Sequence, residues 1–188
     1  MKAFVLSLIV SSVCYVPLCA QEREDNSLSK QVDKARLPVP DEEEQLFYLQ
    51  RDPNRNTVVY TLNKKDGQLD EENPVKAYWI LYEEEGERKE LSYIQRKFAY
   101  GINAKKLAEN EYEIHLTSCK RIPLRLAYCA ESGQYEAFTA IHNKPAVVER
   151  IFVRINGGTL FKPHVDYIEL TCRDSQSGQP LTRTIPMN

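Results

Sequence analysis

Histidine and cysteine are the side chains best suited to catalysis or metal binding, and this 188-residue chain has few of either. The three histidines, His115, His142 and His164, are well separated in sequence. His164 and Asp166 would share one face of a strand and could hold a metal together, but a third ligand would have to come from a distant segment. We therefore predict no metal centre.

A nucleophilic site needs a serine or cysteine beside a general base. The chain contains no G-x-S-x-G motif, and His115 and Cys119 would lie about 13 Å apart along a strand. A pair such as Cys129 or Cys172 with His142 could form only through folding. The 27 acidic residues are too many to single out a carboxylate pair. Motifs for nucleotide phosphates and EF-hand calcium loops are also missing, so we assign no catalytic residue and no cofactor.

Aromatic residues are the better indication of a binding surface. The chain contains eleven tyrosines, and several lie between residues 78 and 100, interleaved with basic side chains. The predicted binding residues are Tyr78, Tyr82, Tyr93, Arg96 and Tyr100. Together, if exposed, they could stack on sugar rings or hold a partner peptide. For most aromatic residues, above all Trp79 and Phe98, we favour a place in the core instead. Tyr78 and Trp79 must face opposite sides of one strand.

The elements that would carry these side chains are mostly strands. Nine segments are rich in β-branched and aromatic residues and are separated by short polar turns. They lie at 46–51, 57–63, 75–82, 111–118, 122–130, 134–143, 146–155, 164–172 and 180–186. Glu131-Ser132-Gly133 and Asn156-Gly157-Gly158 are typical of hairpin turns. We predict a mainly β fold, an antiparallel β-sandwich or barrel-like domain of about nine strands with one short helix.

The helix is predicted over residues 89–99. Leu91, Ile94 and Phe98 recur at spacings of three and four, which is typical of an amphipathic helix with one buried face. Gly101 would end it as a left-handed residue. A continuous pair of strands is the alternative, since residues 100–107 could themselves be extended.

The amino terminus has the three-part layout of a secretory signal peptide. Lys2 precedes an uncharged apolar run over residues 3–18, and Ala20 precedes the first charges. The run is shorter than the roughly 20 apolar residues that span a membrane, and no later segment is apolar enough. We predict a signal peptide over residues 1–20, and no transmembrane segment once it has been cleaved.

Behind the cleavage site we predict a flexible polar tether over residues 21–44 and a single β-rich domain over residues 45–188. Bulky residues precede Cys14 and Cys19, which does not fit a lipoprotein signal. We therefore expect an exported protein of the periplasm or the exterior, without a lipid anchor.

The net charge bears on the kind of partner, and the number of cysteines bears on possible disulfides. The formal charge of −2 becomes −3 when Lys2 is removed, which does not suggest nucleic acid as a partner. Cys119, Cys129 and Cys172 would remain after cleavage, and this odd number leaves at least one thiol without an internal partner. One disulfide among them and three small buried residues are both open interpretations.

Four segments, LFYLQR, NTVVY, NPVKAYWI and LSYIQRKFAYGI, occur in an order that resembles the bacterial domain-of-unknown-function family 4833. The resemblance would cover residues 45–185, with the match carried by Asn73, Pro74, Trp79, Tyr100 and Gly101. It implies an exported, single-domain, mostly β bacterial protein. It transfers no activity and no catalytic residue.

The first functional hypothesis is a non-enzymatic envelope or secreted module that binds a protein or a glycan. The export signal, the strand-rich pattern and the missing catalytic motifs favour it. One alternative is an exported hydrolase-type enzyme whose dispersed catalytic residues meet only in the fold. A further alternative is a small-lipid carrier, which would need an apolar cavity inside a barrel.

Overall fold

The computed structural model describes residues 33–159 and 162–187, and most of these residues lie in strands. The strands are β1 (Gln45–Arg51), β2 (Thr57–Leu62), β3 (Lys64–Lys65), β4 (Gln68–Leu69), β5 (Val75–Leu81), β6 (Glu87–Glu90), β7 (Ile102–Ala108), β8 (Glu111–Leu116), β9 (Cys119–Cys129), β10 (Gln134–Ile141), β11 (Lys144–Gly158), β12 (Pro163–Asp174) and β13 (Pro180–Pro186). The helical segments are η1 (Lys34–Arg36), α1 (Tyr93–Gln95) and the π-helical η2 (Arg96–Tyr100). The mainly β prediction is confirmed, and each of the nine predicted segments contains a strand.

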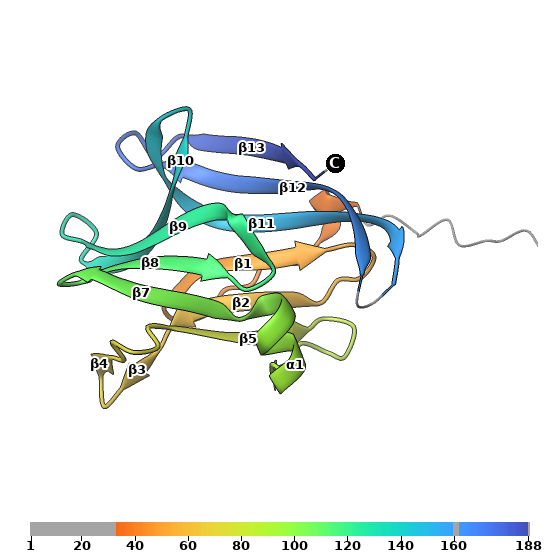
Figure 1. The fold of residues 1–188 in the computed structure, drawn as a ribbon, viewed down its shortest axis with the longest axis horizontal. Coiled ribbons are helices and arrows are strands. Elements are labelled where there is room, and N and C mark those ends of the chain that lie inside the picture. Colours follow the sequence, from red (N-terminus) through yellow and green to blue (C-terminus); the bar gives the residue numbers. More distant parts are fainter. Residues whose placement is uncertain (1–32, 160–161, 188) are drawn as a thin grey trace, which may run out of the picture.

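The large sheet curls into a half-barrel (Figure 1). Its strand order is β6-β5-β2-β1-β11-β10-β9-β8-β7, and β12 and β13 extend from β11 as a separate flap. Among the described strands, all pairings are antiparallel except that of β1 with β11, which is parallel and aligns Tyr48 with Arg150 and Arg51 with Val153. The predicted antiparallel sheet is therefore mixed. No local signal marks the exception, because a parallel pair joins segments that are distant in sequence.

β11 holds this arrangement together because it has neighbours along both edges. β12 pairs with it from Ala146 to Gly158. Along its other edge, β11 pairs first with β10, as far as Val147, and then with β1, from Arg150 onward. Beyond the paired residues, the backbone N–H of Asp52 donates to the carbonyl of Val153 at 3.2 Å. The sheet therefore branches where β10 and β1 separate.

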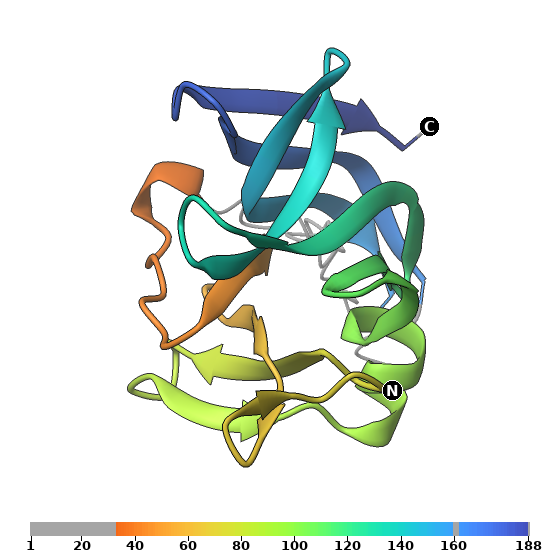
Figure 2. The same ribbon diagram turned by 90° about the vertical axis from the view of Figure 1, so that its left-hand side faces the viewer.

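The concave side of the sheet encloses one main core (Figure 2). Its largest fully buried side chains include Tyr60, Phe47 and Tyr112. The rings of Phe47 and Tyr60 stack with their centroids 4.5 Å apart. Trp79 belongs to this core, whereas Tyr78 lies in a smaller cluster with Tyr48, Val59 and Ile80. The prediction that Tyr78 and Trp79 face opposite sides is confirmed.

The helical segment is shorter than predicted, because Glu87–Glu90 pairs with β5 as strand β6. The helix begins after Ser92, whose side chain accepts from the backbone N–H of Gln95 while the Gln95 side chain accepts from that of Ser92. Gly101 has a φ of −66°, so the predicted left-handed conformation is wrong. Glycine is needed there for a different reason: a Cβ atom would lie 2.0 Å from the carbonyl oxygen of Arg96.

One of the two predicted turns is displaced. Residues 131–133 join β9 to β10 as expected, with the N–H of Gly133 donating to the carbonyl of Cys129 at 2.9 Å. Gly157 and Gly158 instead belong to β11, with φ values of 87° and 86°. Beyond them, the backbone groups of Thr159 and Lys162 bond to each other at 3.0 and 3.1 Å, and β12 begins at Pro163. Positive φ at these glycines thus fits irregular pairing with β12 rather than a tight turn.

The second half of the segment predicted as a flexible tether lies against the domain. The Nζ atom of Lys34 forms an ion pair with Glu169 at 2.7 Å. The side-chain amide of Gln50 donates to the carbonyl of Pro38 at 2.6 Å, and Leu37 is buried. Residues 33–44 therefore belong to the folded unit. The predicted signal peptide and the first part of the tether lie outside the described residues.

We predict that Gly101→Ala destabilises the protein by about 2–3 kcal/mol, because the added Cβ atom would clash with backbone that must then shift. Chemical denaturation would measure the loss. Gly86→Ala is the matched control, since its φ of 82° strains alanine but nothing lies within 4 Å of the new Cβ atom. That control should lose only about 1 kcal/mol. Equal losses in the two variants would contradict the close packing at Gly101.

Candidate functional site

A short helix displays large apolar side chains to solvent. The exposed fractions are 73% for Tyr93, 57% for Ile94 and 63% for Phe98. The Nζ atom of Lys97 lies 5.5 Å from the ring centroid of Tyr93 and 5.3 Å from that of Phe98. It also donates to the Tyr93 hydroxyl at 3.3 Å. We call Tyr93, Ile94, Lys97 and Phe98 the helix patch.

The end of this helix is fastened to the buried part of the domain. The hydroxyl of Tyr60 donates to the carbonyl of Tyr100 at 3.0 Å. The rings of Trp79 and Tyr100 meet nearly at right angles, with centroids 4.9 Å apart. The backbone N–H of Thr117 donates to the carbonyl of Gly101 at 2.9 Å. The helix patch is therefore held on a rigid support.

The exposure of Ile94 and Phe98 corrects the predicted helix face. Only Leu91, which precedes the helix, is buried as expected. Phe98 lies in the π-helical η2, whose wider turn does not keep the three-and-four spacing, whereas Ile94 is exposed on α1. Tyr100 occupies the inner position beside Trp79, and Phe98 points to solvent although we favoured a core position for it.

The five predicted binding residues do not form one surface. Tyr93 belongs to the helix patch. Arg96 lies on the same helix but forms an ion pair with Glu90 at 3.5 Å and donates to the carbonyl of Leu91 at 3.4 Å. Tyr100 is half-buried against Trp79. Arg96 and Tyr100 thus connect the helix to its surroundings.

Tyr78 and Tyr82 belong to the smaller cluster, on the other side of the sheet from the main core. The hydroxyl of Tyr78 donates to the carboxylate of Glu42 at 2.9 Å. Burial is the main cause and this hydrogen bond the second, and together they raise the pKa of Tyr78 to about 12. Tyr78 is therefore a packed residue that fastens residues 33–44 to the sheet. Sequence periodicity separates it from Trp79 but cannot reveal the contact with Glu42.

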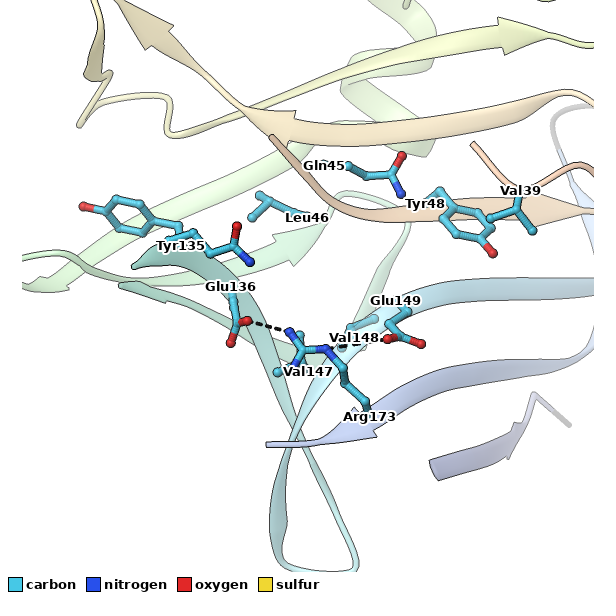
Figure 3. A pocket seen from close by; sticks show the side chains of 11 residues that line it. Val39, Gln45, Leu46, Tyr48, Tyr135, Glu136, Val147, Val148, Glu149 and Arg173 are labelled. Atoms are coloured by element: carbon cyan, nitrogen blue, oxygen red, sulfur yellow. Dashed lines mark hydrogen bonds and ion pairs between the residues drawn. The ribbon is translucent and has the colours of Figure 1, made fainter. Parts of the chain in front are cut away.

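The branch between β10 and β1 leaves a pocket of about 330 Å³ (Figure 3). Arg173 of β12 reaches into it and pairs with Glu136 at 2.5 Å and with Glu149 at 3.6 Å. Glu136 is buried, and Arg173 supplies its compensating charge. The three charged groups satisfy one another, so we assign them a structural role at the branch.

A larger hollow of about 620 Å³ is lined in part by β3 and β4. These strands lie on the opposite side of the domain from α1 (Figure 1). The β3–β4 hairpin, the β9–β10 turn and Tyr112 of β8 contribute to its lining. We call it the mouth hollow. Gln45, Gln134 and Tyr135 line both this hollow and the branch pocket, so the two are neighbours.

The histidines remain separated after folding. His142 lies in the turn between β10 and β11 with a φ of 50°, and His164 is exposed near the start of β12. The Nε2 atom of His115 lies 3.3 Å from a carboxylate oxygen of Glu113. Within residues 33–159 and 162–187, no three or more His, Cys, Asp or Glu side chains gather as a metal site.

Cys119 and Cys172 are buried, Cys129 is half-buried, and none of the three forms a disulfide. Burial raises the pKa of Cys172 to about 12. At Cys129, hydrogen bonds from the backbone N–H and hydroxyl of Ser132 and from the backbone N–H of Glu131 lower the thiol pKa. Cys129 therefore ionises more readily than Cys172.

These observations define a half-barrel domain with a mixed sheet and exposed surfaces at both ends. Among the described residues, none of the helices is long and apolar enough to cross a membrane. Residues 47–183 match the domain-of-unknown-function family DUF4833. The chain belongs to that family, which confirms the resemblance. No curated protein and no solved structure matches the chain.

We predict that iodoacetamide modifies Cys129 with a pH midpoint below the ordinary thiol value of about 8.5, because only the thiolate reacts and its pKa is lowered. The rate would be measured from pH 6 to 9 by mass spectrometry in a Cys14→Ser, Cys19→Ser background. Ser132→Ala removes the hydroxyl donor and leaves the two backbone N–H donors, so it should move the midpoint upward. A midpoint at or above the ordinary value would contradict the hydrogen bonding at Cys129.

Proposed function

We propose that this domain is a non-enzymatic binding module of an exported bacterial protein, and that the helix patch binds another protein. The observation that supports it is the exposure of three large apolar side chains on a helix that is fastened beneath. Soluble domains seldom expose such clusters without a partner. A rigid aromatic surface also loses little conformational entropy when it binds.

The chemistry of the patch favours a protein over a glycan. Ile94 and Phe98 offer apolar surface with no polar atoms, and Lys97 is the charged group between the aromatic rings. Arg96 is engaged with Glu90. A sugar needs several hydrogen-bonding partners around its ring, whereas aromatic and aliphatic anchors with a nearby cation are typical of protein interfaces.

The alternatives receive less support. A small-lipid carrier needs an apolar cavity, but side chains such as Phe47, Tyr60 and Tyr112 fill the inside of the barrel. A hydrolase needs a nucleophile or acid beside a base, and the described structure places His142 in a surface turn and His164 at an exposed strand end. Neither arrangement favours catalysis.

Export is the second part of the proposal and rests on residues 1–20, with their basic start, apolar run and small residue before Gln21. We propose the periplasm or the exterior as the location, without a lipid anchor. Amino-terminal sequencing of the protein from its native host should begin at Gln21. An intact amino terminus on the protein in the cytosol would refute this part.

We predict that Phe98→Ser weakens partner binding at least tenfold, because a central aromatic anchor commonly contributes that much to an interface. A photo-crosslinking residue at Ile94 in the native host would identify the partner, and titration calorimetry with the purified partner would give the dissociation constant. Stability should change by less than about 0.5 kcal/mol, since Phe98 is mostly exposed.

Leu107→Ser is the matched control, since Leu107 is an apolar residue on β7 that is 51% exposed and lies outside the helix patch. It should leave the partner's affinity unchanged. Equal binding by the Phe98→Ser and Leu107→Ser variants, or retention of a glycan in place of a protein at the patch, would refute the assignment.

A further inference from the structure

The mouth hollow is lined by residues of β3 and β4, and these strands lie on the far side of the domain from the helix that carries the helix patch (Figure 1). Its volume of about 620 Å³ falls in the range of small-molecule sites, roughly 300–1,000 Å³. Tyr112, which is almost fully buried, and the partly buried Leu62 and Leu69 form part of its wall. Polar side chains from the surrounding turns complete the lining, so the hollow combines an apolar wall with hydrogen-bonding groups.

The charges around the hollow are already compensated. Lys64 forms an ion pair with Glu44, and Lys106 forms one with Glu71 at 2.5 Å. The carboxylate of Asp70 pairs with Lys65 at 2.7 Å. An ionic ligand would have to break such a pair to find a counter-charge. The electrostatics of the hollow therefore favour a neutral ligand.

Three of the polar side chains that line the hollow, Gln45, Gln68 and Gln134, are amides, which both donate and accept hydrogen bonds. In the described part of the chain, the exposed side chains of Gln68 and Gln134 make no hydrogen bond to protein groups, and both line the hollow. Gln45 donates to the carbonyl of Pro40 at 3.3 Å, but its own Oε1 atom is buried without a donor. A ligand rich in hydroxyl groups would satisfy these amides, because a hydroxyl also donates and accepts.

Two tyrosine rings stand beside these amides. Tyr128 is 49% exposed, and its ring lies nearly perpendicular to that of Tyr135 with centroids 5.5 Å apart. The hydroxyl of Tyr135 donates to the side-chain oxygen of Asn110 at 2.6 Å, which fixes the orientation of this ring. An exposed ring in a fixed frame can stack on the C–H face of a pyranose.

We propose that the mouth hollow binds a neutral oligosaccharide, with Tyr128 as the stacking platform and Gln68, Gln134 and Gln45 as hydrogen-bonding groups. The hydroxyl groups of a sugar could bond to the three amide side chains, and its C–H face could stack on the exposed ring of Tyr128. A neutral sugar would also leave the ion pairs around the hollow intact. This site is independent of the helix patch, so either assignment can fail without the other.

The test is titration calorimetry of the folded protein with neutral tetrasaccharides of glucose, mannose, xylose and N-acetylglucosamine. At least one should bind with a dissociation constant of about 1 mM or below. Tyr128→Ala should weaken this binding about fivefold to tenfold through loss of stacking. Gln134→Ala should weaken it severalfold. Thermal melting would confirm that both variants remain folded.

Tyr93→Ala is the matched control, because it removes an exposed tyrosine from the opposite end of the domain. It should leave sugar affinity unchanged, and Tyr128→Ala should leave binding at the helix patch unchanged. The proposal is overturned if no neutral tetrasaccharide binds at about 10 mM, or if only an acidic sugar such as tetragalacturonate binds. It also fails if folded Tyr128→Ala and Gln134→Ala variants bind as the parent does.

Discussion

A β-strand has two hydrogen-bonding edges, and the division of the two edges of β11 determines the shape of this domain. β12 occupies one edge along almost the whole strand, while β10 and β1 share the other. Since two strands cannot occupy the same stretch of edge, they must separate near Val148. This branch lets the sheet curl around one core, and it places the Arg173 ion pairs where the sheet opens.

The two ends of the barrel differ in how their exposed groups are supported. At the helix end, Tyr100 packs inward against Trp79 and its carbonyl accepts from Tyr60, so Phe98 is left in solvent. At the mouth end, the side chains of Gln68 in β4 and Gln134 in β10 make no hydrogen bond within the described residues. An apolar surface on a fixed helix suits protein contacts, whereas uncommitted amides beside a tyrosine suit a hydroxylated ligand. The different chemistry of the ends follows from their different local structure.

Most of the strands could be predicted because alternation and turn residues act over a few positions. The parallel pairing of β1 with β11 could not, because it depends on which edge remains available after β10 separates. The helix face was predicted wrongly, since the three-and-four rule assumes α-helical geometry and η2 is a π-helix. The mouth hollow was also missed: Tyr128 and Gln134 flank the turn between β9 and β10, whereas Gln68 lies in β4, so no single segment carries their pattern.

The filled core between the two ends bears on how the ends would act together. Phe47, Tyr60 and Tyr112 are fully or almost fully buried, so the space between helix and mouth is occupied by packed side chains. Coupling between distant sites requires an element with two arrangements that both ligands bias. The strands that join the ends are hydrogen-bonded to one another and pack on a single core. The two surfaces are therefore expected to bind independently, and the domain would hold a protein and a sugar at a fixed separation.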